Sequence, residues 1–101
     1  MGKLKTEWTG KAKTQLKQIH DYLKYEKKTP QGAANVKADL IQASKGVIYA
    51  EQYQKDDINP NYRRIVVRHY KLIYKEEKGK IIILRVFDTL RNPERLLAEN
   101  E

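Results

Sequence analysis

The chain has 101 residues, with 21 Lys and Arg against 13 Asp and Glu, a formal net charge of +8 and a pI near 9.7. This length supports one domain with one modest core and excludes a second core. The lack of Cys excludes disulfides, a thiol nucleophile and a Cys-based zinc site. A charge this positive predicts that the partner is a nucleic acid, an anionic membrane or an acidic protein.

The arginines all lie after residue 62, whereas the first half of the chain uses only Lys. They are Arg63, Arg64, Arg68, Arg85, Arg91 and Arg95. Because Arg suits phosphate and carboxylate recognition better than Lys, this bias favours an anion-binding surface in the second half, although a drift of composition would also explain it.

No apolar run has the length of a membrane span, and Met1-Gly2-Lys3 leads into a predicted strand rather than a signal peptide. We therefore expect a soluble, cytoplasmic protein without a membrane partner.

The first predicted elements are a strand and two helices. Residues 4–9, LKTEWT, alternate in polarity and predict a short strand, with Trp8 as a core anchor. From about Thr9, apolar residues recur at three- and four-residue steps, which predicts an amphipathic helix. Thr29 and Pro30 suit a cap and a first helical turn, so a second helix begins there and continues to about Tyr49. The apolar stripes are Ala12, Leu16, Ile19 and Leu23 in the first helix, and Val36, Leu40, Ala43 and Val47 in the second.

The second half of the chain predicts a loop and three strands. The segment EQYQKDDINPN has no period and predicts a loop at 51–61. Strands follow at 62–67, 70–76 and 80–87, joined by a turn at Arg68-His69 and by EEKGK, where Gly79 can adopt a positive φ. The run IIIL is apolar on both faces and places the last strand in the centre of the sheet. The tail at 91–101 turns at Asn92-Pro93, adds one helical turn and frays.

The order β-α-α-β-β-β predicts a single α+β domain over residues 1–101. In this domain a helical hairpin packs on one face of a small, mainly antiparallel sheet. Nothing else in so short a chain is expected to cover the opposite face. Alternate strand positions, including the cationic ones, should therefore face solvent or a partner.

The chemistry predicted for this sheet is cationic and needs no metal or other cofactor. The acidic residues are scattered and Ser44 is the only Ser, so neither a metal site nor a Ser-His-Asp site is supported. Between residues 62 and 85, eight Lys and Arg face two Glu, a local balance of +6. Cations interleaved with rings are typical of a surface for RNA or single strands, and such a cluster could also cleave RNA. Tyr on strands also packs in cores, so the rings could be core or partner-facing. The rings are Tyr62, His69, Tyr70 and Tyr74.

Two segments resemble the RelE/ParE superfamily of type II toxin-antitoxin toxins. In YRRIVVRHYKLIY, the pair Arg63-Arg64 precedes a strand that runs from Tyr70 to Tyr74. In ILRVFDTLRNPERL, a strand with Arg85 is followed by the close Arg91 to Arg95. The resemblance extends over nearly the whole chain and implies a RelE/ParE-like toxin domain.

The superfamily contains two kinds of toxin. RelE-like members are ribosome-dependent endoribonucleases that cut mRNA with a cluster of Lys and Arg, and ParE-like members inhibit DNA gyrase. Lys71 and Arg91 stand where the nucleases carry functional Arg residues, and Arg63 or Arg64 could match their basic strand. However, Leu97 replaces the RelE tyrosine, and Thr89-Leu90 replace the His-Tyr pair of a related branch.

The missing proton-transferring residues favour a ParE-like toxin that acts on gyrase. The alternative is a ribosome-dependent nuclease with Lys71, Arg91 and His69 as catalytic residues, and a second alternative is an antitoxin-binding relative without toxicity. The resemblance also implies an acidic, partly disordered antitoxin over the cationic sheet and the groove beside the helices, and the charge of +8 fits it. The residues predicted to bind RNA or another target are Arg63, Arg64, Arg68, Tyr70, Lys71, Arg85 and Arg91.

Overall fold

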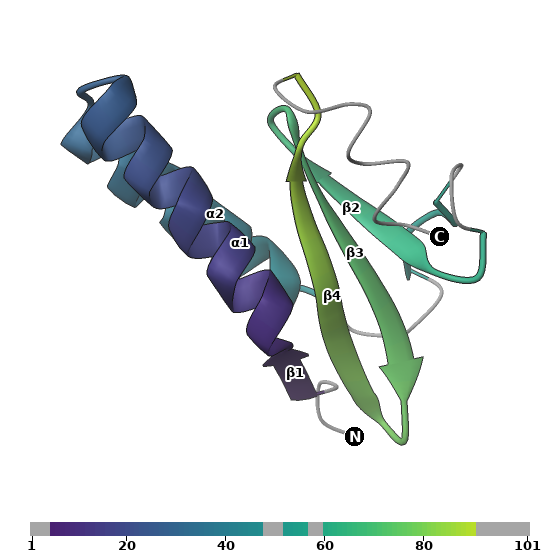
Figure 1. The fold of residues 1–101 in the computed structure, drawn as a ribbon. Coiled ribbons are helices and arrows are strands. Elements are labelled where there is room, and N and C mark those ends of the chain that lie inside the picture. Colours follow the sequence, from purple (N-terminus) through teal and green to yellow (C-terminus); the bar gives the residue numbers. More distant parts are fainter. Residues whose placement is uncertain (1–4, 48–51, 57–59, 91–101) are drawn as a thin grey trace.

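The computed structural model describes residues 5–47, 52–56 and 60–90, which form two layers (Figure 1). Helices α1 (Gly10–Asp21) and α2 (Pro30–Lys45) lie side by side on one side of a four-stranded sheet. The strands are β1 (Lys5–Trp8), β2 (Arg63–Val67), β3 (Tyr70–Glu77) and β4 (Lys80–Asp88). The predicted α+β fold and its element order are confirmed.

The sheet has the strand order β1-β4-β3-β2, with β4 between β1 and β3 as its two apolar faces predict. β3 runs antiparallel to β2 and to β4, whereas β1 runs parallel to β4. The register shifts in the middle of β4, where Ile73 pairs with Arg85 but Tyr74 pairs with Ile83. Leu84 is therefore an extra residue in β4, a β-bulge that changes which side chains share a face.

The caps of both helices agree with the sequence. The Thr9 hydroxyl accepts the Ala12 N–H at 3.1 Å, and the Thr29 hydroxyl accepts the Gly32 N–H at 3.2 Å. A Cβ at Gly32 would lie 2.6 Å from the Thr29 hydroxyl oxygen, so this position favours a glycine. α1 continues as a π-helical turn, η1 (Tyr22–Glu26), closed by a Lys27 N–H to Tyr22 O bond of 3.1 Å.

The main core lies between the helices and the sheet and contains the predicted stripes. Ala12, Leu16 and Ile19 of α1 are buried there against sheet residues such as Leu72 and Ile83. α2 ends at Lys45, before the predicted end near Tyr49, which lies outside the described residues. The tail 91–101, with Arg91 and the Asn92-Pro93 turn, also lies outside them. None of the described helices is long and apolar enough to cross a membrane.

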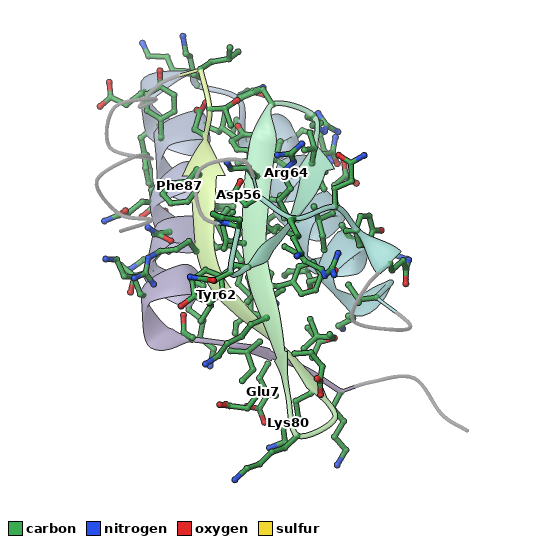
Figure 2. All side chains as sticks on the ribbon, turned by 90° about the vertical axis from the view of Figure 1, so that its right-hand side faces the viewer. Glu7, Asp56, Tyr62, Arg64, Lys80 and Phe87 are labelled. Carbon is green, nitrogen blue, oxygen red and sulfur yellow. The ribbon has the colours of Figure 1, made fainter. Side chains whose placement is uncertain are left out.

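The expectation that the sheet face opposite the helices is uncovered is wrong. We call this the outer face, and Figure 2 shows Asp56, Tyr62, Arg64 and Phe87 over it. Ile73 and Phe87 are buried there in a second apolar cluster to which Tyr62 and Leu84 add their side chains. The predicted loop takes part in this cover because its end pairs with β2, through Asp56 N–H to Tyr62 O and Arg64 N–H to Gln54 O.

Candidate functional site

The predicted cationic surface is divided between the two faces of the sheet. Arg64 and Arg85 both pair with Ile73, and Lys71 pairs with Phe87, so these three cations belong to the outer face. Arg63 pairs with the core residue Tyr74, and its guanidinium donates to Tyr53 O at 2.8 Å. The alternation of β2 causes this division, because neighbouring residues of a strand point to opposite faces.

Lys71 is held in a buried ion pair. Its Nζ lies 2.6 Å from Asp56 Oδ1, and the two side chains are 9% and 0% exposed. Asp56 is placed by the backbone pairing that ties residues 54–56 to β2, including the antiparallel bridge of Lys55 with Arg63. The positive charge that the sequence offers at this position is therefore neutralised and withdrawn from solvent.

Arg64 and Arg85 are left as the cations flanking Ile73. Arg64 donates to Gln54 Oε1 at 3.4 Å, and Arg85 donates to the neighbouring carbonyl oxygen of Leu84 at 2.9 Å. The Nε of Arg85 is buried and has no hydrogen-bond partner in the part of the chain that the structure describes.

Two further predicted residues do not join this surface. Tyr70 is 1% exposed and lies in the main core, because it alternates with Lys71 and shares its face with Leu72 and Tyr74. Arg68 extends from the β2–β3 turn to the helices, where it forms an ion pair with Asp39 of α2 at 2.7 Å. The prediction that the Tyr70 ring contacts a target is therefore wrong.

His69 lies at one end of the sheet, in the β2–β3 turn directly before β3. Its Nε2 is 3.4 Å from Asp88 Oδ1, and its ring packs on Tyr70 with centroids 4.2 Å apart. Thr89 donates to the His69 carbonyl oxygen from its hydroxyl at 2.6 Å and from its N–H at 3.0 Å. Hence His69 is tied to the end of β4, while the position of Arg91 lies outside the described residues.

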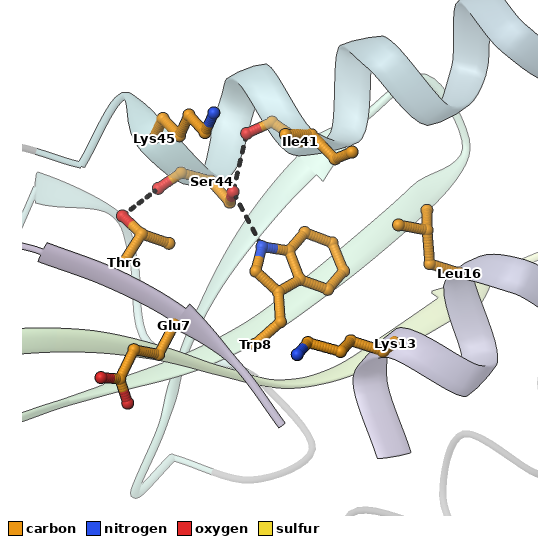
Figure 3. Close-up of a pocket in the computed structure, with 8 residues that line it drawn as sticks. All are labelled: Thr6, Glu7, Trp8, Lys13, Leu16, Ile41, Ser44 and Lys45. Atoms are coloured by element: carbon orange, nitrogen blue, oxygen red, sulfur yellow. Dashed lines mark hydrogen bonds between the residues drawn. The ribbon is translucent and has the colours of Figure 1, made fainter. Parts of the chain in front are cut away.

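A second cationic surface lies on the helical side. A cavity of about 590 Å³ opens between β1, α1 and α2 (Figure 3), and a cavity of about 250 Å³ continues it past Lys13 and Leu16. We call the two together the lysine groove. Its rim carries four lysines and one acid, Glu7, which itself pairs with Lys80 at 3.0 Å. The lysines are Lys13, Lys17, Lys37 and Lys45.

The floor of the lysine groove is apolar and fixed by hydrogen bonds. Trp8 Nε1 donates to the Ser44 hydroxyl at 3.1 Å, and that hydroxyl donates to Ile41 O at 2.7 Å. The Trp8 ring is thereby directed toward Ser44 of α2, and Leu16 lines the same cavity (Figure 3). This groove was not predicted from the sequence, because each of its lysines is typical of a solubilising residue on the polar side of a helix. Its signal was the concentration of Lys along the rim of both predicted stripes.

No three His, Asp or Glu side chains gather as a possible metal site within the described ranges. The geometry gives two cationic surfaces, one on each side of the sheet. The outer face presents Arg64 and Arg85 around an apolar cluster, and the helical side presents four lysines around an apolar groove. Both arrangements suit binding of an acidic, partly apolar partner.

Two comparisons with known proteins give a match, one of the sequence and one of the fold. Residues 6–93 match the family model described as ParE toxin of type II toxin-antitoxin system, parDE. Among solved structures, the fold is similar to a chain of the "Chromosomal ParDE TA system from P. aeruginosa", with a TM-score of 0.68 and 20% identity. This match covers 82% of the present chain and 92% of that one. No curated protein matches the sequence.

Proposed function

Because the chain belongs to the ParE family of toxins from type II toxin-antitoxin systems, we propose that it inhibits growth by acting on DNA gyrase. We propose further that an acidic antitoxin neutralises it. The gyrase target is what the family suggests, and the placement of the cations disfavours the nuclease alternative. The antitoxin step is supported by the charge and shape of the lysine groove.

The buried Lys71–Asp56 pair is the observation that carries the choice of target. Metal-free RNA cleavage needs a cation that can reach the phosphate and a group that can transfer a proton. Lys71 stands at the position of a nuclease cation, but its ammonium is bound to a fully buried carboxylate at 2.6 Å. His69, the remaining proton-transferring candidate, is bound to Asp88 at the end of the sheet. This arrangement supports a toxin that binds its target over one that cuts RNA.

The lysine groove supports the antitoxin proposal. An acidic amphipathic segment would place apolar side chains against Trp8 and Leu16 and carboxylates beside the rim lysines. Complementary charge of this kind accelerates association and disfavours basic competitors. Thr6, Glu7 and Trp8 of β1 line one side of the groove, and Ile41, Ser44 and Lys45 of α2 line the other (Figure 3).

The target is tested by inducing the protein in cells and by adding the purified protein to gyrase. We expect growth arrest, intact mRNA in primer extension, and loss of DNA supercoiling by the purified enzyme. Arrest with supercoiling unchanged would remove gyrase as the target. Normal growth on induction would remove the toxin assignment and leave a non-toxic relative.

The neutralisation step is tested with the protein encoded beside this chain, if that neighbour is small and acidic. Lys13→Glu reverses a charge on the rim of the lysine groove and should weaken binding at least about tenfold, because like charges across an interface repel. Lys11→Glu makes the same change on an exposed residue of α1 that does not line the groove, and should leave the affinity within about twofold. Equal effects of the two variants would contradict the assignment of the groove.

A ribosome-dependent nuclease is the second candidate, and the arginines of the outer face are the observation that favours it. Arg64 and Arg85 flank Ile73 on the outer face, and guanidinium groups are donors that suit a phosphate. Codon-aligned mRNA cuts after induction, abolished by Lys71→Ala with Arg91→Ala, would establish this candidate in place of gyrase inhibition. Cuts that persist in the double variant would exclude both residues from the site.

A further inference from the structure

A cavity of about 330 Å³ lies where the helical layer meets one end of the sheet, and neither proposed surface includes it. Its walls come from η1, from the β2–β3 turn and from the end of β4, so three distant segments of the chain form it. We call it the end pocket. The residues used below are Tyr22, Lys27, His69, Tyr70 and Asp88.

An imidazole ring held in a fixed orientation forms one wall of the end pocket. One face of the His69 ring packs on Tyr70, whose side chain is buried, while 40% of the His69 side chain is exposed. Asp88 lies 3.4 Å from Nε2, and the two hydrogen bonds from Thr89 fix the backbone of the turn. The ring is therefore preorganised to stack on a flat ligand, at little cost in side-chain entropy.

The π-helical turn supplies a second ring and a cation. The bond from Lys27 N–H to Tyr22 O brings these two residues together across the widened turn. Lys27 Nζ lies 5.9 Å from the centre of the Tyr22 ring, and both side chains line the pocket. Turns of this type are rare in proteins and are found frequently at functional sites.

We propose that the end pocket binds a nucleotide, with the base against His69 and Tyr22 and the phosphate on Lys27. A volume of about 330 Å³ is at the lower end of the range for small-molecule sites. Bases stack favourably on aromatic side chains whatever their sequence, and an ammonium provides a point charge for a phosphate. A nucleoside or an inorganic phosphate alone would use only part of the pocket. The ligand is either a free mononucleotide or the phosphorylated end of a nucleic acid.

The test is a heteronuclear NMR titration of the full chain with AMP, adenosine, inorganic phosphate and a 5′-phosphorylated dinucleotide. We expect shifts at the residues lining the end pocket, and binding of AMP at least about tenfold tighter than of adenosine or phosphate. Lys27→Glu should weaken AMP binding by about tenfold or more, as should Tyr22→Leu, which keeps an apolar side chain at this position. Lys24→Glu reverses a charge in the same turn but outside the pocket lining, and should change the affinity by less than about twofold.

Three results would overturn the proposal. They are the absence of shifts in the pocket at millimolar AMP, equal affinity for AMP and phosphate, and equal losses from Lys27→Glu and Lys24→Glu. A dinucleotide that binds much more tightly than AMP would support the end of a nucleic acid as the ligand, and the reverse would support a free mononucleotide. Unfolding curves recorded for each variant separate lost binding from lost fold. None of these outcomes depends on whether gyrase is the target.

Discussion

Two ion pairs of nearly equal length allow the effect of burial to be measured within one protein. Lys71–Asp56 has an N–O distance of 2.6 Å with side chains 9% and 0% exposed. Arg68–Asp39 has a distance of 2.7 Å with side chains 51% and 47% exposed. Because the contact distance is matched, removing the carboxylate of each pair compares a buried pair with an exposed one.

Asp56→Ala should destabilise the fold by at least about 3 kcal/mol, because it leaves the Lys71 ammonium buried without its partner. This is a large part of the total of about 5–15 kcal/mol expected for a small domain. At about 4–8 °C per kcal/mol for a chain of this size, the melting temperature should fall by about 12–24 °C. Asp39→Ala should cost less than about 1 kcal/mol, since solvent screens the exposed pair and Ala favours the helix.

The measurement is urea and thermal unfolding followed by circular dichroism, with the wild type and both variants at the same pH and ionic strength. A third variant, Asp56→Ala with Lys71→Met, removes both charges and should recover most of the loss, because an apolar side chain fits beside Phe87. The reasoning is refuted if Asp56→Ala costs no more than Asp39→Ala. In that case the Lys71 ammonium reaches water in solution, and the main argument against a nuclease role falls with it.

Two backbone predictions are independent of these charges. Gly32→Ala should fail to stabilise α2, because the new Cβ would lie 2.6 Å from the Thr29 hydroxyl and displace a cap that contributes about 1 kcal/mol. Gly10→Ala has open space around its Cβ and should be neutral or stabilising. A gain in stability for Gly32→Ala in urea unfolding would contradict this. Lys78→Asn should raise the free energy of unfolding by about 0.5–1 kcal/mol. The reason is that Lys78 and Gly79 both have positive φ, as in a type I′ turn, which favours Asn-Gly. An unchanged or lower unfolding midpoint would count against this assignment of the turn.

The elements of the fold could be predicted because each has a hydrophobic period of its own. The stripe of α1, the cap at Thr29 and the turn at Gly79 are local features, and each is found where the pattern predicts it. The face to which a strand residue points is also local in principle. Tyr70 and Leu72 are two positions apart in one strand and therefore point to the same face, which indicates that the Tyr70 ring belongs in the core.

The candidate site could not be predicted to the same extent, because its charges are decided by contacts between distant segments. Asp56 lies in a stretch without any period, and the sequence gives no sign that its carboxylate reaches Lys71. The bulge at Leu84 shifts the register of β4 and thereby places Arg85 on the same face as Arg64. The sequence predicts Arg68 as part of the cationic sheet, but its side chain forms an ion pair with Asp39 of the helical layer.

These contacts change what a lysine at position 71 means. A cation at this position would support phosphate chemistry if its ammonium were open to the outer face. The structure instead places a carboxylate from the neighbouring segment against it, so the same residue neutralises a buried acid and offers little charge to a ligand. Among the described residues, the cations that line a cavity are the four lysines of the lysine groove and Lys27 of the end pocket, while Arg64 and Arg85 lie on the outer face. Whether such a toxin binds or cuts therefore depends on the acid paired with the lysine as much as on the lysine itself.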